Sequence, residues 1–218
     1  MSKKIKIACF SDNHGEIVEN IPNADIVICS GDVTYDRTGW SLDRFIGWFS
    51  KLPHKEKIFI AGNHDFCLTN SMCKAMLPKD IVYLEDSLYV SKTGLKIYGS
   101  PYTPKFFNWA FMKERGDEIT EVWKKIPKGL DVLVTHGPAS GILDNNKRGV
   151  QCGCYDLGRY INIKKPKVHI FGHIHHSRGI KKLGDTLSVN CSILDDDYDY
   201  IYEPYLIEVE KNKNDQSL

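Results

Sequence analysis

The sequence lacks several features that mark membrane proteins and nucleic-acid-binding proteins. Among its 218 residues, no apolar run approaches the roughly 20 residues that a transmembrane helix requires. The N-terminal stretch MSKKIKIACFSDNHG has no long apolar segment of the kind found in signal peptides. The 29 Lys and Arg residues balance 28 Asp and Glu residues, so no broad basic surface for long nucleic acids or anionic membranes is expected. We therefore expect a cytoplasmic protein that has no membrane partner.

Cysteine spacing of the kind that holds zinc is also missing. The seven cysteines are odd in number and scattered, and several lie inside apolar runs. Cys152 and Cys154 in QCGCYD are the closest pair, but cysteine zinc sites usually place two or more residues between paired ligands and add a second pair downstream. The cysteines are therefore interpreted as reduced thiols.

No internal repeat is visible, and no stretch rich in Pro, Gly or Ser marks a domain boundary. With 42% hydrophobic and 26% charged residues, the chain can bury a sizeable core. We expect one domain over residues 1–210 and a flexible C-terminal tail over residues 211–218. The acidic stretch DDDYDY is expected to be a solvated loop, and the oligomeric state stays open.

Five short runs have the apolar or β-branched character of strands that are buried on both faces of a sheet. They are Ile5–Phe10, Asp25–Ser30, Lys57–Ala61, Asp131–Thr135 and Lys167–Phe171. Further strands are predicted in IVYLEDSLYVSKTGLKIYGSPYTP, TLSVNCS and EPYLIEVE. The strand content is therefore large for this length.

Helices are predicted between some of these strands, which gives an α/β alternation. Apolar residues recur at helical spacing in SLDRFIGWFSKLP, with Ser41 as a possible N-cap and Pro53 as a stop. A second helical pattern runs from Ile119 to Ile126 and ends at Pro127.

Polar motifs follow the five predicted strands, in the order SDNHG, GDVT, GNHD, HGPAS and GHIHH. In open α/β sheets the loops after the strands converge, so these motifs are expected to meet. The candidate residues are Asp12, His14, Asp32, Asn63, His64, Asp65, His136, His173 and His175. Each alone is readily explained as a turn or cap residue, but their joint occurrence favours a metal site. Their O and N donors suit Mn²⁺, Fe or Zn²⁺, and they outnumber the ligands that one ion takes.

The motifs D-x-H, G-D, G-N-H-D, H-G-P and G-H-x-H, in this order, resemble those of the calcineurin-like metallophosphoesterase superfamily, from about Ile5 to about Glu210. Within it, AGNHD, GSPYTPKFFNWAFMKERG and VHIFGHIHHSRG resemble the metallophosphoesterase-domain-containing (MPPED) branch. The resemblance implies an α/β sandwich of two mixed β-sheets flanked by α-helices. It also implies a phosphodiesterase that hydrolyses cyclic nucleotides, such as 2′,3′-cyclic AMP, or other small phosphodiesters.

The resemblance further implies a dinuclear metal site with Asp32 as the bridging ligand. One ion would be held by Asp12, His14 and His175, and the other by Asn63, His136 and His173. The expected cofactors are two divalent ions, preferably Mn²⁺, with Fe, Zn²⁺ and Mg²⁺ as alternatives. In the hydrolysis of phosphate esters that the resemblance implies, a hydroxide that bridges the two ions would attack phosphorus.

Catalytic roles follow from the same resemblance. His64 would act near the phosphate as a leaving-group acid or a transition-state stabiliser, and Asp65 would orient it. Asn63, His64 and His173 would contact the substrate. Arg37 in GDVTYDRTG is one residue out of register with the phosphate-binding block of Ser/Thr protein phosphatases, so it receives no such role.

Several residues stay open between a functional and a structural interpretation. The aromatic residues Tyr102, Phe106, Phe107 and Trp109 could stack on a nucleobase or pack within the protein. Lys105, Arg115 and Arg148 could touch phosphate, although a plain surface role is simpler. His54, His169 and His176 are interpreted as bystanders.

The alternative functions are a phosphomonoesterase or protein phosphatase, and a nucleotide-binding scaffold with weak catalysis. A nuclease is disfavoured because the chain has no basic excess for a long polyanion.

Overall fold

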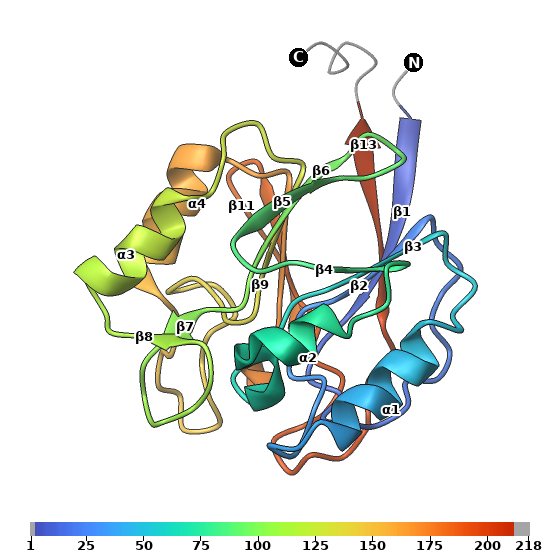
Figure 1. Ribbon diagram of the computed structural model, residues 1–218. Helices are drawn as coiled ribbons and strands as arrows, with labels where there is room; N and C mark the ends of the chain where they lie inside the picture. Colours follow the sequence, from blue (N-terminus) through green and yellow to red (C-terminus); the bar gives the residue numbers. More distant parts are fainter. Residues whose placement is uncertain (1–2, 212–218) are drawn as a thin grey trace.

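Two β-sheets packed face to face form the centre of the protein in the computed structural model, which describes residues 3–211 (Figure 1). The first sheet has the strand order β13 (Tyr205–Lys211), β1 (Lys3–Phe10), β2 (Ile26–Cys29), β3 (Glu56–Phe59) and β4 (Ile81–Tyr83). The second has the order β11 (Gly179–Leu183), β12 (Thr186–Asn190), β10 (Val168–Phe171), β9 (Val132–Thr135), β6 (Lys96–Ser100) and β5 (Ser87–Val90). A small third sheet pairs β7 (Thr103–Pro104) with β8 (Met112–Lys113).

Burial on both faces explains why the central strands are so apolar. In β1, Ile5 and Ile7 belong to the core between the two sheets, whereas Ala8 and Phe10 belong to the core on the other face. Successive side chains of a strand point to opposite faces, so a strand covered on both sides needs apolar residues at every position. The strand predictions are thus confirmed, with ends that differ by one or two residues.

Helices cover the outer faces of both sheets (Figure 1). The first sheet carries α1 (Trp40–Phe49) and α2 (Ser71–Ala75), and the second carries α3 (Asp117–Lys124) and α4 (Tyr155–Lys164). The predicted sandwich of two mixed sheets flanked by helices is confirmed. The sequence patterns missed α4, which buries Leu157 and Ile161 and begins where the Cys154 sulfur accepts a hydrogen bond from the Leu157 N–H.

The expectation that Ser41 caps α1 is wrong. The helix begins at Trp40, its N-cap is Gly39, and the Ser41 hydroxyl donates to the Asp36 carboxylate 2.9 Å away. The Ser41 hydroxyl thus bonds to the Asp36 side chain outside the helix and does not cap the first turn of α1.

Parallel strands bring the carboxyl ends of both sheets to one edge. β1, β2 and β3 run parallel in the first sheet, and so do β6, β9, β10 and β12 in the second. At this edge the sheets are joined, because Ser11 forms a bridge with Ser192 and the Ile193 N–H donates to the Ser11 carbonyl oxygen. The loops of the two sheets therefore share one surface.

The two ends of the predicted domain meet in the first sheet. β13 pairs antiparallel with β1, and Lys211 is the last residue of β13. The rest of the predicted tail, residues 212–218, lies outside the described residues. Within residues 3–211, no helix is both long enough and apolar enough to cross a bilayer.

Candidate metal centre

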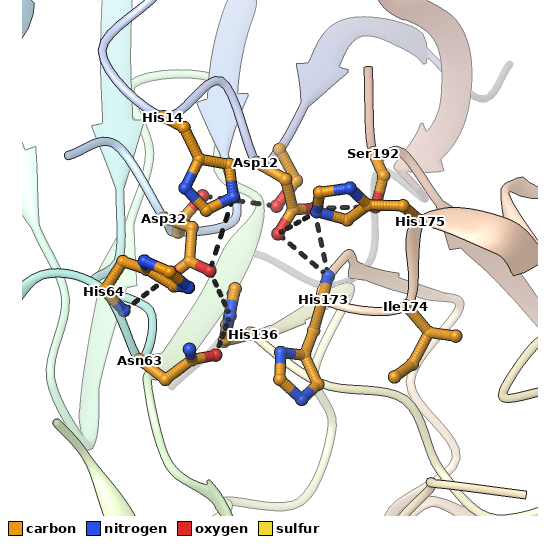
Figure 2. Close-up of polar contacts among 12 residues, drawn as sticks. Asp12, His14, Asp32, Asn63, His64, His136, His173, Ile174, His175 and Ser192 are labelled. Carbon is orange, nitrogen blue, oxygen red and sulfur yellow. Dashed lines mark hydrogen bonds and ion pairs between the residues drawn. The ribbon is translucent and has the colours of Figure 1, made fainter. Parts of the chain in front are cut away.

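The predicted metal ligands converge at the joined edge of the two sheets (Figure 2). Three groups have ligand atoms that all lie within 4.8 Å of one another, namely Asp12–His14–His175, His14–Asp32–His64 and Asp32–His136–His173. Asn63 joins the third group through its Oδ1 atom, which lies 3.0 Å from His136 Nε2. The structure thus brings together all seven residues that were predicted as metal ligands.

The two loops that carry the carboxylates are hydrogen-bonded to each other. The Asp12 N–H donates to the Gly31 carbonyl oxygen and the His14 N–H to the Asp32 carbonyl oxygen, each over 3.0 Å. Asp12, His14 and Asp32 have positive φ angles of 58°, 42° and 52°. Such angles are uncommon for residues other than glycine and persist where the surrounding structure holds them.

Two glycines make room for the carboxylates. A Cβ atom at Gly62 would lie 2.2 Å from Asp32 Oδ1, and one at Gly172 would lie 2.1 Å from Asp12 Oδ2. Any side chain at these positions would push a carboxylate out of the site. The glycines of GNHD and GHIHH thus serve the geometry of the site.

Asp12 is a buried carboxylate held from two sides. The His173 N–H donates to both of its oxygens at 3.0 Å, and the Ser192 hydroxyl donates to Oδ2 at 2.6 Å. Burial opposes ionisation of Asp12, but the hydrogen bond and charge of His175 outweigh burial and lower the pKa of Asp12. The carboxylate is therefore charged at neutral pH.

Asp32 lies between the other two groups. Its Oδ2 atom is 3.3 Å from His136 Nε2 and 3.8 Å from His14 Nε2, and its Oδ1 atom accepts from the His64 N–H at 2.8 Å. Burial again opposes ionisation, but the charge of His136 outweighs it and lowers the pKa of Asp32. Asp32 is thus a charged carboxylate that faces histidines from both sheets.

Outer hydrogen bonds orient two of the histidines. Nδ1 of His136 lies 3.0 Å from the Ser30 carbonyl oxygen, and Nδ1 of His175 lies 2.8 Å from the Asp195 carbonyl oxygen. A carbonyl oxygen only accepts, so each Nδ1 carries the proton and each Nε2 faces the site. Burial lowers the pKa of both rings, but Asp32 beside His136 and Asp12 beside His175 raise both pKa values to about 9.

The other two histidines among the predicted metal ligands, His14 and His173, are neutral. Burial lowers the pKa of His14 to about 4 and that of His173 to about 3. Both ring nitrogens of His14 are buried and have no hydrogen-bond partner among residues 3–211. Buried polar atoms nearly always have a partner, so an unpartnered imidazole beside two carboxylates is suited to bind a cation. The donor set of carboxylates, imidazoles and an amide fits divalent metal ions.

His64 lies at the rim of this arrangement. Its ring centroid is 4.6 Å from that of His14 and 4.4 Å from that of Trp109. Trp109 also contacts Phe66, so its ring packs against other side chains of the protein. This packing is one of the two interpretations that the sequence left open for Trp109. The protein thus holds the His64 side chain by ring packing.

Asp65 acts on the loops and not directly on the His64 ring. Its buried carboxylate accepts from the N–H groups of Gly62, Val33 and Thr34 and from the Thr34 hydroxyl. Burial and the charge of Asp32 raise the pKa of Asp65 to about 7. Asp65 therefore ties the GNHD loop to the GDVT loop.

The predicted bystanders lie outside the three groups. His176 is half exposed and pairs with Asp196, His169 is buried against Thr135, and His54 contacts the Pro22 carbonyl oxygen. Arg37 stacks on Phe66, with its guanidinium carbon 4.2 Å from the ring centroid.

Two of the three basic candidates from the sequence also have structural partners. Arg115 donates to the carbonyl oxygens of Cys152 and Gly153, and Lys105 pairs with Glu114. Cys152 and Cys154 are free thiols.

The sequence interpretation missed three residues near the site. Ser192 holds Asp12, the Asp195 carbonyl oxygen holds His175, and the Tyr198 ring lies 4.9 Å from the His14 ring. The acidic stretch DDDYDY is therefore part of the site and not merely a solvated loop. Ser192 follows the strand β12, so the strand-end pattern that marked the other motifs also pointed to it.

Comparison with known proteins agrees with this geometry. A family model described as Calcineurin-like phosphoesterase matches residues 5–177. Human metallophosphoesterase domain-containing protein 1 is 31% identical over 96% of this chain and 72% of its own length. A UPF0046 protein of Caenorhabditis elegans is 33% identical over 94% of this chain and 81% of its own length.

Among solved structures, TT1561 of Thermus thermophilus has a similar fold. Its TM-score is 0.59 at 13% identity, and the match covers 86% of this chain and 89% of that one. At this identity the likeness concerns the fold, which has the same two-sheet architecture.

Proposed function

Since the chain belongs to the calcineurin-like phosphoesterase family, we propose that it is a phosphodiesterase that uses two divalent metal ions and hydrolyses small phosphodiesters, cyclic nucleotides among them. The observation that carries this proposal is the overlap of the three ligand groups. Asp32 belongs to two of them, one shared with His14 and His64 and one with His136 and His173. A carboxylate shared in this way suits two neighbouring cations, which would repel each other without an anion between them.

Seven residues would hold the ions. Asp12, His14 and His175 would bind one, Asn63, His136 and His173 the other, and Asp32 both. Mn²⁺ is the preferred ion, with Fe, Zn²⁺ and Mg²⁺ as alternatives, because these ions accept mixed O and N donors. When bound, two such ions activate water and neutralise charge on the phosphoryl group.

His64 is the chain's own candidate for proton transfer. Its backbone N–H donates to Asp32 and its ring packs on Trp109, so the imidazole is held beside the metal ligands. In this proposal His64 is not itself a ligand. A protonated imidazole in this place would donate to the leaving oxygen and stabilise charge that develops in the transition state. Asn63 and His173 would contact the phosphoryl group from the other side.

Small esters are favoured over long polyanions. The chain has a formal net charge of +1, which gives no broad field for a nucleic acid. Phe106, which is half exposed, has its ring centroid 5.6 Å from the His173 ring and offers an apolar surface next to the ligands. This arrangement suits a single organic substituent beside the phosphate.

We also propose a reducing location, the cytoplasm. All seven cysteines are free thiols, and five of them are buried in the core. Free thiols persist in reducing compartments. Fractionation of cells that express the tagged protein tests this proposal.

Hydrolysis assays with defined metals test the proposed function. The chelated protein is reloaded with Mn²⁺, Fe²⁺, Zn²⁺ or Mg²⁺ and assayed with bis-p-nitrophenyl phosphate, p-nitrophenyl phosphate and 2′,3′-cyclic AMP. We expect metal-dependent turnover of both diesters, and Mn²⁺ to support the highest kcat/KM. Faster turnover of the monoester would indicate a phosphomonoesterase, and tight nucleotide binding without turnover would indicate a scaffold protein.

A further inference from the structure

Arg178 is a half-buried cation of the GHIHHSRG motif that has no role in the function proposed above. It follows the short 3₁₀-helix η2 (His175–Ser177), and its backbone N–H donates to the His175 carbonyl oxygen over 3.1 Å. A 3₁₀-helix has about three residues per turn, so Arg178 lies one turn after a predicted metal ligand. Its position is thus tied to that of His175.

The guanidinium of Arg178 joins the two ends of the loop that connects β12 to β13, residues 191–204. Nη1 donates to the Ser192 carbonyl oxygen at 2.5 Å, and Nη2 donates to the Glu203 carbonyl oxygen at 2.6 Å. A guanidinium is a planar fork of donors, so it holds two acceptors at a fixed separation. The side chain therefore closes this loop at its base.

Two tyrosine rings hold the guanidinium in place. Its Cζ atom lies 4.0 Å from the ring centroid of Tyr205 and 4.8 Å from that of Tyr202. Cations are attracted to the faces of aromatic rings, and the planar guanidinium also stacks on them. Tyr205 is the first residue of β13, so Arg178 is anchored on the first sheet.

The loop that Arg178 closes contacts every side chain of the Asp12–His14–His175 group. The three contacts are those of Ser192 with Asp12, of Asp195 with His175 and of Tyr198 with His14. Figure 2 shows the first of these contacts. Within residues 3–211, no hydrogen bond or ring contact joins the loop to Asn63, His136 or His173, the predicted ligands of the other ion. The loop thus orients the ligands of one ion.

We propose that Arg178 is a positioning residue that holds the loop of residues 191–204 against the Asp12–His14–His175 group and thereby sets the affinity of that group for its ion. The inference rests on the proposed function, because it takes two ions to occupy two ligand groups. The other ion's ligands have partners of their own, such as the Ser30 carbonyl oxygen 3.0 Å from Nδ1 of His136. Their affinity should therefore not depend on Arg178.

Titration of the metal-free protein with Mn²⁺ tests the proposal independently of turnover. Calorimetry separates the two binding steps, and the step that His175→Ala loses belongs to the Asp12–His14–His175 group. Arg178→Ala should weaken this step about 10–100-fold, as loss of an outer partner of a metal ligand does, and should leave the other step unchanged. Arg159→Ala, at an exposed arginine of α4, is the matched control and should change neither step.

A selective effect separates positioning from a general structural role, which would weaken both steps. Equal weakening of the two steps in Arg178→Ala, or weakening of neither, overturns the inference. If Arg178→Ala does not fold, Arg178→Lys decides, because it keeps the charge but replaces the planar fork by a point charge. Weakening of the same single step in Arg178→Lys supports the inference, and two unchanged steps overturn it.

Failure of the proposed function gives a different result. If the unmodified protein binds neither Mn²⁺ nor any of the other candidate ions, the dinuclear proposal is wrong. Hydrogen exchange of the metal-free protein, measured on peptides from residues 191–204, then still tests the action of Arg178 on the loop. Faster exchange in Arg178→Ala than in Arg159→Ala supports this action, and equal exchange overturns it.

Discussion

The imidazole of His64 lies against the indole of Trp109, with ring centroids 4.4 Å apart and ring planes inclined by 31°. The loops that carry these rings are tied together, because the Ala110 N–H donates to the Asn63 carbonyl oxygen over 3.0 Å. Phe66 packs on Trp109, and Arg37 lies over Phe66. His64 thus lies at the inner end of a row of four side chains in contact, which limits the positions its ring can take.

Removal of the indole should release His64. We expect Trp109→Ala to lower kcat about 10-fold with little change in KM, because a misplaced catalytic group loses much of its effect. Trp109→Phe should recover most of the rate, since a ring remains beside His64. Trp40→Ala, at an exposed tryptophan of α1, is the control. Loss of bound metal in Trp109→Ala would contradict a role through His64.

Substitution of His64 itself should slow hydrolysis while the metal stays bound. We expect His64→Ala to lower kcat by about 10²–10⁴, the usual contribution of general acid–base catalysis. The loss should be larger for 2′,3′-cyclic AMP, whose leaving alkoxide needs a proton, than for a p-nitrophenyl ester. Elemental analysis of the purified variant checks the metal content. A uniform loss for all leaving groups would argue against proton transfer.

Asp32→Ala should abolish metal-dependent hydrolysis. Without the shared carboxylate, two adjacent cations would repel each other, so at least one ion should be lost. Metal content by mass spectrometry and kcat with added Mn²⁺ are the measurements, and Asp185→Asn at an exposed turn serves as the control. Wild-type activity in a metal-stripped Asp32→Ala sample would refute the mechanism.

Ser192→Ala should weaken metal binding although Ser192 is not a predicted ligand. The hydroxyl donates to Asp12 Oδ2 at 2.6 Å, and without it the carboxylate loses a partner that fixes its direction. Loss of such outer partners typically lowers metal affinity about 10–100-fold. Competition with a chelator measures the change, and Ser50→Ala at the C-cap of α1 provides the comparison. An unchanged affinity would show that His173 alone orients Asp12.

The buried His169 should make the protein sensitive to acid. Its Nε2 lies 2.7 Å from the Thr135 hydroxyl, which donates to Gly137, so Nε2 carries the proton and the buried Nδ1 has no partner among residues 3–211. Burial lowers the pKa of His169 from 6.5 to about 3. Below pH 6.5 the unfolded state binds a proton that the folded state does not, so stability falls as the pH decreases towards 3.

Urea unfolding of the metal-free protein checks this pH dependence. Between pH 6 and pH 4, His169→Gln should reduce the slope of the unfolding free energy by about 1.4 kcal/mol per pH unit. Met72→Gln, at an exposed residue of α2 that has no titratable group, should leave the slope unchanged. An identical slope in both variants would mean that His169 takes up a proton in the folded state.

The strands and the site residues at their ends could be predicted because both depend on short-range patterns. A near-continuous apolar run such as Val168–Phe171 indicates a buried strand, and the polar residues after it must then lie at the edge of the sheet. His173 and His175 were placed in this way. The pattern was less informative for α4, since an isolated pair such as Leu157 and Ile161 does not distinguish a helix from a loop.

The sequence by itself therefore determined the strands and the candidate ligands, because apolar runs and the residues after each strand are local properties of the chain, and the order of those motifs determined the family and, through the resemblance, the sandwich. Only the tertiary structure decided which groups orient those ligands. Ser192 reaches Asp12 across 180 positions and the His173 N–H reaches it across 161. Such partners are set by the pairing of strands and by the junction of two sheets, and the identity of either residue carries no sign of the other.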